Sequence, residues 1–357
     1  MKKTFWLLVA AMAITICVNA QTIQEGEMAI VYYSPKTNVV LDFSYEEEIQ
    51  TKGIYADWAS KLLGINEVVK ENKTTYTLQG VQIRTRTEAD TSRPHKVVAE
   101  ANVPIQLLTL NEKNILVGYN LPATGFPKPR ETHKSSTRDA VLSRVTQQEP
   151  APYTEEVLEA KSISAAAQAV AKQILRIRES RMYLLSGEVE HAPADGTAMK
   201  IVLDELAKQE KQLTELFTGR KECLRKHHIV SYQPMAENGK TFHKKLYFST
   251  ENGFTEAENA EAEDIGITIQ HTRPQKKAAG SDTKGKKKGG EPSQLVYNLP
   301  GEGQVSVRYR GETMAERTLP LAQFGIDVPL ARELFTGKTL PVIRFNEKTG
   351  NIISISK

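Results

Sequence analysis

The histidines and carboxylates of this 357-residue chain are its first candidates for chemistry, because such groups ligate metals and exchange protons. His191 has three acidic neighbours in sequence, Glu188, Glu190 and Asp195. One imidazole and three carboxylates could hold a cation, but solvated charge is far commoner in a turn of this composition. We therefore predict no metal site at His191.

The other histidines give no stronger indication of a metal site. His227 and His228 are adjacent, and neighbours on a strand point to opposite faces, so they could not easily share an ion. His95 lies near Glu88 and Asp90, and we interpret all three as exposed strand residues. The sequence thus predicts no metal-ligating residue and no cofactor.

Carboxylates are grouped in three places, Glu46–Glu48, Glu155–Glu156 and Glu256–Asp264. Acid–base catalysis needs two carboxyl groups that face one cleft in contrasting environments, whereas runs of acids are usually solvated. The chain has no nucleophile elbow, phosphate loop or dinucleotide fingerprint. We predict no catalytic residue and favour a non-enzymatic protein. A glycan hydrolase that uses a carboxylate pair is the alternative.

The strongest local anomaly is the basic segment 273–292, which has seven basic residues against two acidic ones and is rich in Gly and Ser. This composition predicts a flexible loop. The loop either binds anions or an acidic partner, or is an insertion that the fold tolerates between two strands. Interleaved aromatic residues are absent, so we predict no nucleic-acid partner. The candidate binding residues are Lys276, Lys277, Lys284, Lys286, Lys287 and Lys288.

Two groups of predicted strands would position these side chains. Val39, Leu41 and Phe43 alternate with polar residues, and residues 74–87 form a second strand with a bulge or bend at Gly80. Between them, a short helix at 55–63 places Tyr55, Trp58, Ala59 and Leu62 on one face. We interpret that face as core rather than as an aromatic platform for a glycan or small molecule.

The middle of the chain is predicted to be helical. Apolar residues recur at nearly 3.6-residue spacing from Tyr153 to Gly219, interrupted by Gly187 and a turn at 192–196. Two long helices with a short joint form an antiparallel hairpin. After Cys223 short alternating segments return, and residues 346–351 form a turn between the last two strands.

These patterns predict an α+β fold in which two β-rich, mostly antiparallel domains flank a long antiparallel helical hairpin. The predicted boundaries are a leader at 1–20, an N-terminal β-rich domain at 21–150, the hairpin at 151–222 and a C-terminal β-rich domain at 223–357. The composition, 39% hydrophobic and 25% charged, is that of a globular protein, and the net charge of +4 is too small to indicate a polyanion partner.

The first twenty residues have the pattern of a secretory signal peptide. Lys2 and Lys3 precede the apolar run Phe5–Val18, and small residues lead to a cleavage site after Ala20. No later run is long enough to form a membrane span, although peripheral association with a membrane is compatible with the sequence.

Export also bears on the two cysteines. Cys17 leaves with the leader, so Cys223 has no partner for an internal disulfide in the mature chain. Ile16 before Cys17 disfavours lipidation, because that position normally holds a small residue.

Several short motifs, in this order, resemble the Bacteroidetes exported family catalogued as domain of unknown function 4831. They are Tyr33-Ser34-Pro35-Lys36-Thr37, Tyr55-Ala56-Asp57-Trp58-Ala59, Leu62-Leu63-Gly64-Ile65, Leu184-Leu185-Ser186-Gly187, Gln209-Glu210, Leu216-Phe217-Thr218-Gly219, Ala322-Gln323-Phe324-Gly325 and Thr349-Gly350. The resemblance implies a periplasmic or outer-membrane-associated protein and supplies no activity, cofactor or catalytic residue.

The sequence therefore favours a non-enzymatic binding or scaffold protein of the cell envelope, whose partner is an envelope protein or a glycan. The many short strands, the hairpin and the basic segment motivate this expectation, since strand edges and helix faces are common docking surfaces. A glycan hydrolase, and a binder of glycans or small molecules built on Tyr55 and Trp58, stay open as alternatives.

Overall fold

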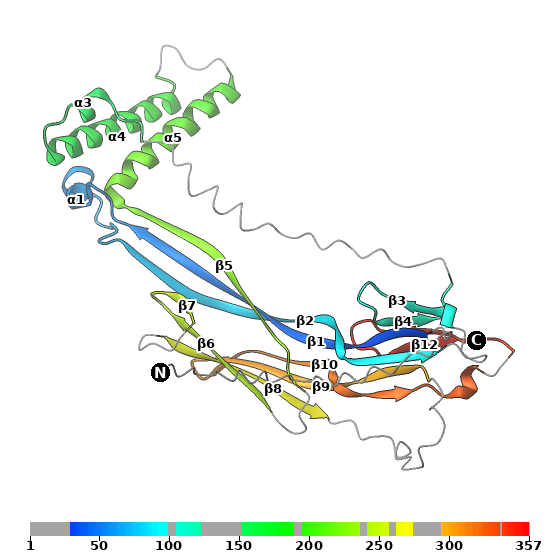
Figure 1. Ribbon diagram of the computed structural model, residues 1–357. Coiled ribbons are helices and arrows are strands. Elements are labelled where there is room, and N and C mark those ends of the chain that lie inside the picture. The colour runs from blue at the N-terminus through cyan, green and yellow to red at the C-terminus, as the bar shows by residue number, and fades with distance from the viewer. Residues whose placement is uncertain are drawn as a thin grey trace, which may run out of the picture.

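The computed structural model describes residues 29–98, 105–122, 151–188, 195–235, 241–256, 262–273, 294–335 and 338–356. The fold is α+β, as predicted. The molecule is elongated: a layered β body continues into an arm of long strands, and the arm ends in a helical head (Figure 1). The predicted leader and most of the basic segment 273–292 lie outside the described residues.

The arm is a three-stranded antiparallel sheet in the order β2-β1-β5. Its strands are β1 (Ala29–Thr51), β2 (Lys73–Val98) and β5 (Arg220–Tyr232). Their alternation of apolar and polar residues gives one covered face and one open face. The register of β1 against β2 shifts between Ser44 and Tyr45, opposite Gly80, which confirms the predicted irregularity there.

A second sheet packs against the body half of the arm, in the order β10-β9-β8-β6-β7. It comprises β6 (Phe242–Ser249), β7 (Gly253–Thr255), β8 (Glu263–Arg273), β9 (Val296–Tyr309) and β10 (Glu312–Pro329). Val39, Leu41 and Phe43, the predicted alternating residues of β1, are fully buried between the two sheets. Burial of this apolar face holds the layers together.

A third sheet closes the end of the body farthest from the head, in the order β12-β11-β4-β3. It contains β3 (Leu108–Leu110), β4 (Leu116–Tyr119), β11 (Val342–Phe345) and β12 (Ile352–Ser356), with the short helix η2 (Ile105–Leu107) before β3 and η3 (Arg332–Phe335) before β11. The predicted turn before β12 is confirmed, since the Gly350 amide donates to the Asn346 carbonyl at 2.6 Å.

The head contains the predicted helical hairpin, α4 (Ile163–Ser186) and α5 (Gly196–Thr218). The short helices η1 (Ala56–Trp58) and α1 (Ala59–Leu63) lie at its base, and α3 (Glu155–Leu158) packs beside α4 (Figure 1). Ser162 and Asp195 cap the two long helices by accepting backbone amides at 3.1 and 2.7 Å. Gly187 ends α4 in the left-handed conformation. The predicted Gly ends are thus confirmed.

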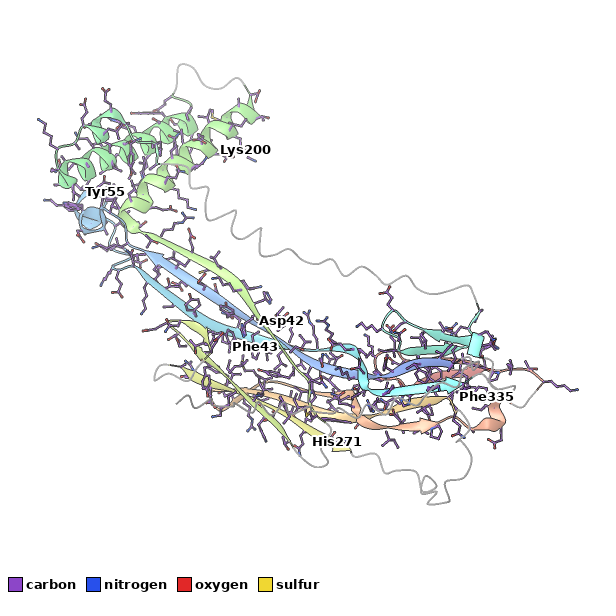
Figure 2. The ribbon with its side chains drawn as sticks, in the orientation of Figure 1. Asp42, Phe43, Tyr55, Lys200, His271 and Phe335 are labelled. Atoms are coloured by element: carbon purple, nitrogen blue, oxygen red, sulfur yellow. The ribbon has the colours of Figure 1, made fainter. Side chains whose placement is uncertain are left out.

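The two-domain layout of the β segments is not confirmed. The arm sheet takes β1 and β2 from before the hairpin and β5 from after it, and the third sheet joins β3 and β4 to β11 and β12. The three apolar clusters lie one after another along the molecule: Tyr55 marks the one in the head, Phe43 the middle one and Phe335 the far one (Figure 2).

Candidate functional site

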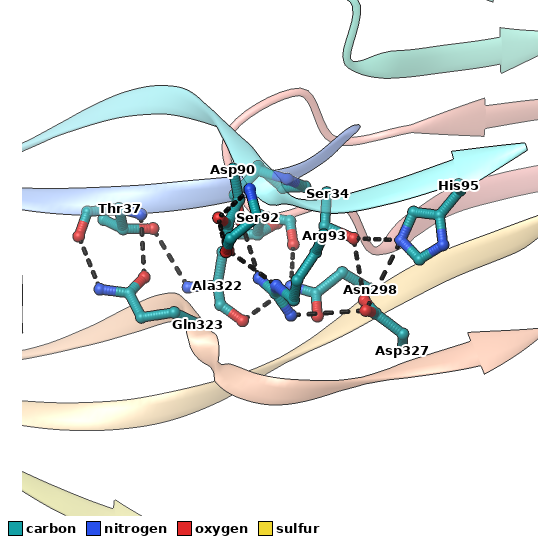
Figure 3. Close-up of polar contacts among 12 residues, drawn as sticks. Ser34, Thr37, Asp90, Ser92, Arg93, His95, Asn298, Ala322, Gln323 and Asp327 are labelled. Atoms are coloured by element: carbon teal, nitrogen blue, oxygen red, sulfur yellow. Dashed lines mark hydrogen bonds and ion pairs between the residues drawn. The ribbon is translucent and has the colours of Figure 1, made fainter. Parts of the chain in front are cut away.

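A polar cluster joins β1, β2 and β10 where the sheets meet (Figure 3). The Ser34 hydroxyl lies 2.7 Å from His95 Nε2 and donates to Asp327 Oδ1 at 2.9 Å. His95 Nε2 also lies 3.5 Å from Asp327 Oδ2. Serine, histidine and aspartate in contact raise the question of a nucleophilic triad, although they lie far apart in sequence.

The geometry does not make Ser34 a nucleophile. In a catalytic triad the serine and the carboxylate approach different nitrogens of the histidine, so that the ring can take the serine proton. Here both oxygens approach the same nitrogen of His95, and Ser34 donates its only proton to Asp327. His95 Nε2 is then the donor towards Ser34. Ser34 is also 4% exposed, which leaves no access for a substrate.

Arg93 completes the cluster. Its Nε donates to Asp90 Oδ2 at 2.8 Å and its Nη1 to Asp327 Oδ2 at 3.4 Å. Burial would raise the pKa of Asp90, but hydrogen bonds from Ser92 and Arg93 outweigh it and lower that pKa. Burial lowers the pKa of His95, opposed by Asp327 and assisted by Arg93. The cluster stabilises the contact of β2 with β10 and offers no activated group.

The interpretation of His95 as an exposed strand residue is wrong. Its side chain is 17% exposed, and its ring packs against Tyr32 with centroids 5.2 Å apart. The partners Ser34 and Asp327 come from distant parts of the chain, whereas only the local acids Glu88 and Asp90 are visible in the sequence near His95.

A second group of polar contacts lies beside this cluster, at a bulge of β10. The ladder with β9 is interrupted between Leu321 and Ile326. Gln323 Oε1 accepts the Thr37 amide at 2.9 Å, and Gln323 Nε2 donates to the Thr37 carbonyl at 2.8 Å. Asn298 Nδ2 donates to the Ala322 carbonyl at 2.9 Å (Figure 3). These amide side chains act as extra strand pairing, which is a structural role.

The remaining described histidines have partners of their own. His227 Nδ1 contacts Asp42 Oδ1 at 2.8 Å, while the His228 ring stacks on Phe254 with centroids 4.2 Å apart. They point to opposite faces of β5, as predicted. His191 lies outside the described residues. Within the described ranges, no group of three or more His, Cys, Asp or Glu side chains is placed to hold a metal ion.

Each of the three predicted carboxylate groups contains at least one acid that pairs with a cation. In the first group, Glu47 is buried, 2.6 Å from Lys226 Nζ. In the second, Glu156 Oε1 lies 3.2 Å from Lys172 Nζ. In the third, a pocket of about 440 Å³ is lined by Glu263 and Asp264, among others.

The pocket does not suit general acid catalysis. Asp264 pairs with Lys245 at 3.0 Å, and Glu263 pairs with Arg310. The hydrogen bond from Arg310 lowers the pKa of Glu263. A general acid must still be protonated near neutral pH, so its pKa has to be raised instead. Part of the acidic run, 257–261, lies outside the described residues.

The head carries the surface that sequence reasoning missed. Fifteen large apolar side chains are exposed among the described residues, and ten of them belong to the head. These ten, which we call the head surface, are Ile54, Tyr153, Leu158, Ile163, Leu175, Met182, Tyr183, Leu185, Ile201 and Val202. Scattered exposed apolar residues are ordinary, but their concentration on one projecting element is typical of a docking surface.

The aromatic face at the base of the head is core, as predicted. Tyr55 is 6% exposed and packs against Phe217 with ring centroids 5.3 Å apart, and Trp58 is partly buried against the same cluster. A glycan platform would need Trp58 exposed. The six candidate lysines of the basic segment lie outside the described residues, so their role stays a prediction.

The comparisons with known proteins place the chain by family alone. No curated protein and no solved structure matches it. No helix in the described part of the chain combines the length and the hydropathy that a membrane span requires. A family model described as "Domain of unknown function (DUF4831)" matches residues 28–353, and the chain therefore belongs to that family.

Proposed function

We propose that this protein is an exported, non-enzymatic binding or scaffold protein of the cell envelope that docks a partner protein on its head surface. The single observation that carries the proposal is the concentration of exposed apolar side chains on the head. Leu158, Met182 and Leu185 are each more than 60% exposed there. Removing such side chains from water is the main driving force of protein association.

The arm supports this role because it separates the head from the body (Figure 1). β1 and β2 pair continuously from the third sheet to the base of the head, apart from the register shifts described. A three-stranded antiparallel sheet is a stiff spacer compared with a coil linker. A scaffold that presents a binding surface away from its own mass needs such an element.

The location is part of the proposal. The leader pattern of residues 1–20 supports export, with cleavage after Ala20, and residence in the periplasm or at the outer membrane. N-terminal sequencing of the protein from its native cell is expected to begin at Gln21. A start at Met1 in a cytoplasmic fraction would contradict the proposal.

The binding role is tested by crosslinking in native envelopes, followed by affinity capture and mass spectrometry. The test variant carries Ile163→Gln, Leu175→Gln and Ile201→Gln, whose native side chains are 64%, 51% and 65% exposed. The control carries Val31→Thr, Ile353→Thr and Ile355→Thr, which are 43%, 63% and 44% exposed and lie in the body. Both variants should fold, because exposed positions tolerate polar residues.

We expect one stoichiometric envelope protein with the wild-type chain and with the control, and a recovery at least about tenfold lower with the head variant. Equal recovery with both variants would show that the head surface does not bind the partner. If no protein is captured by the wild-type chain, the proposal fails, and a glycan array then tests the glycan-binding alternative.

A further inference from the structure

The edges of the three sheets are protected unequally against pairing with another strand. Among the described strands, the terminal ones are β2 and β5, β10 and β7, and β12 and β3. Proteins block such edges with charged residues, prolines or very short strands. β3 and β7 have three residues each, whereas β2, β5 and β10 are long and carry several charged residues. Of these six strands, β12 alone has none of the three protections.

β12 is an apolar edge that is open in the described part of the chain. Ile352–Ser356 read Ile-Ile-Ser-Ile-Ser, with no charge and no proline. One side of β12 pairs with β11, and no strand of the described ranges pairs with the other side. Ile353 and Ile355 are 63% and 44% exposed. β12 therefore offers unpaired backbone groups and apolar side chains together.

The exposed isoleucines continue the apolar face of the third sheet. Ile355 lies directly opposite Ile343 in the pairing of β12 with β11, and Ile343 is fully buried in the far apolar cluster. Directly opposite residues of a sheet share a face, and so do residues two apart on a strand. Ile353 and Ile355 thus lie on the core side of the sheet, where the body stops covering it.

A bulge in β12 leaves this edge usable. The pairs Arg344–Ser354 and Phe345–Ile352 flank Ile353, which has no partner residue on β11. A bulge bends and twists its strand locally. The pairing with β11 is regular from Ser354 to Ser356, so most of the strand keeps its ladder geometry.

The sequence of β12 is self-complementary. In an antiparallel pair of two copies centred on Ser354, Ile353 would lie opposite Ile355 of the second copy, and the two Ser354 side chains would face each other. Apolar and β-branched side chains would meet on one face and hydroxyl groups on the other, which are favourable cross-strand pairs. We propose that β12 pairs antiparallel with β12 of a second copy of this chain, across a twofold axis at Ser354.

The charges around β12 favour this occupant. No like charges would meet along the strand, because Ile352–Ser356 have none. The cation beside Ser354 is Arg344 on β11. Arg344 and its counterpart would be three strand spacings apart, about 14 Å, which exceeds the screening length of about 8 Å in physiological salt. The same pairing at β5 would bring Lys226 and Arg225 close to their counterparts, which disfavours it there.

The pairing would join two four-stranded sheets into one continuous sheet. A twofold contact uses the same patch on both copies, so it closes at the dimer. A five-residue strand buries less area than an interface of standard size, so we expect a dimer that dissociates at micromolar concentrations. The head takes no part in this contact, and the inference therefore does not rest on the proposed function.

Sedimentation velocity of the purified exported protein tests the pairing. We expect monomer at about 1 μM and dimer at about 300 μM. Ile353→Lys with Ile355→Lys puts charges on the apolar face of the edge and should raise the dissociation constant at least about tenfold. The matched control is Ile229→Lys with Val31→Lys, whose native side chains are 63% and 43% exposed, and it should change the constant by less than about twofold.

Two results of this experiment would overturn the inference. A monomer at every concentration would show that β12 does not pair with a second copy, and the occupant of the edge would then be a strand of another protein. A dimer that both variants weaken equally would place the contact elsewhere. Species larger than a dimer would contradict a closed twofold contact.

Disulfide formation tests the register and does not depend on a lysine variant that folds. In chains that carry Cys17→Ser and Cys223→Ser, Ser354→Cys places two cysteines directly opposite each other, within the Cα distance that a disulfide spans. Ser356→Cys places them four residues apart along the strand, about 13 Å, which is too far. We expect mild oxidation to crosslink the Ser354→Cys chain at least about tenfold more than the Ser356→Cys chain. Equal yields, or no crosslink at Ser354, would refute the pairing.

Discussion

Two regions of the molecule reverse the usual placement of polar side chains on the surface and apolar side chains in the core. One is the polar junction where the sheets of the body meet, and the other is the head surface. At the junction, Ser34, Asn298 and Thr37 are buried and hydrogen-bonded. On the head, side chains as apolar as Leu158 and Leu185 are about 70% exposed. The residue types that usually perform catalysis therefore hold this fold together, and the types that usually build a core face the solvent.

This comparison shows why composition alone misleads about where a protein acts. Buried polar groups are retained when they find partners, and the junction supplies partners to Ser34, Thr37 and the Asn298 side-chain nitrogen from β2, β10 and the turn before β12. Exposed apolar groups are retained when a partner covers them, and the head sits at the end of an arm where one can approach. We therefore expect the function to depend on the head surface rather than on the Ser, His and Asp side chains of the junction.

The largest expected effect comes from a change that breaks the junction. Gly325 lies in the β10 bulge, where an added Cβ would lie 1.9 Å from the Leu299 carbonyl oxygen. Because that contact is with backbone, Gly325→Ala must displace β9 or the bulge. We expect it to lower the free energy of unfolding by about 3 kcal/mol or more, measured by urea denaturation.

The matched control is Gly266→Ala in β8, where an added Cβ meets nothing within 4 Å. Its effect should be within about 0.5 kcal/mol. Equal losses for the two variants would mean that the close approach at the bulge does not support the junction.

The stability of the junction should also depend on pH. Burial lowers the pKa of His95 below the value in the unfolded chain, so the unfolded state binds the proton first. The stabilising contribution is complete above the unfolded pKa of about 6.5 and is lost as pH falls through the lowered folded value. Stability measured by urea denaturation should therefore fall between pH 7 and 5, with a slope of at most about 1.4 kcal/mol per pH unit from this group.

The control for this pH effect must account for His228, whose pKa burial also lowers. In a His228→Gln background, His95→Gln should make the slope between pH 7 and 5 shallower. Asp90 and Glu263, with pKa values below their usual range, should change stability only at lower pH. An unchanged slope after His95→Gln would remove His95 from the pH response.

The sequence predicted the elements whose signals are local. The alternation at Val39, Leu41 and Phe43, the end of α4 at Gly187 and the turn before β12 each depend on neighbours in sequence, and all are confirmed. The Leu-Phe-Thr-Gly end of α5 was predicted for the same reason.

The arrangement of the sheets could not be predicted in this way. β1 pairs with β5, and β4 pairs with β11. In each pair, one strand precedes the helical hairpin in sequence and the other follows it. Strand patterns show which face is buried but not which strand lies beside it. A related limit explains His95, since Ser34 reaches it through the β1–β2 pairing and Asp327 through the contact of β10 with that sheet. It also explains the head surface, since helical periodicity does not show how wide the buried stripe is.

A smaller effect is expected within the head itself. Ser162 caps α4 by accepting the Ala165 amide at 3.1 Å. Ser162→Ala should lower the free energy of unfolding by about 1 kcal/mol, because one orphan amide of the first turn loses its acceptor. Ser162→Thr keeps an oxygen acceptor and should lose less than half as much. If both variants lose the same amount, the cap does not contribute as proposed.

The smallest effect on stability is expected where the proposed effect on binding is largest. Leu175→Gln and Ile201→Gln change side chains that are 51% and 65% exposed, so the free energy of unfolding should change by no more than about 0.5 kcal/mol. Leu213→Ala, in a fully buried position of the same hairpin, should lose about 3 kcal/mol and serves as the contrast. The two exposed variants should nevertheless lose partner capture, because an apolar contact contributes to affinity only when the partner covers it. Losses of several kcal/mol at Leu175 and Ile201 would show that these residues support the fold, and the head would then no longer differ from the junction.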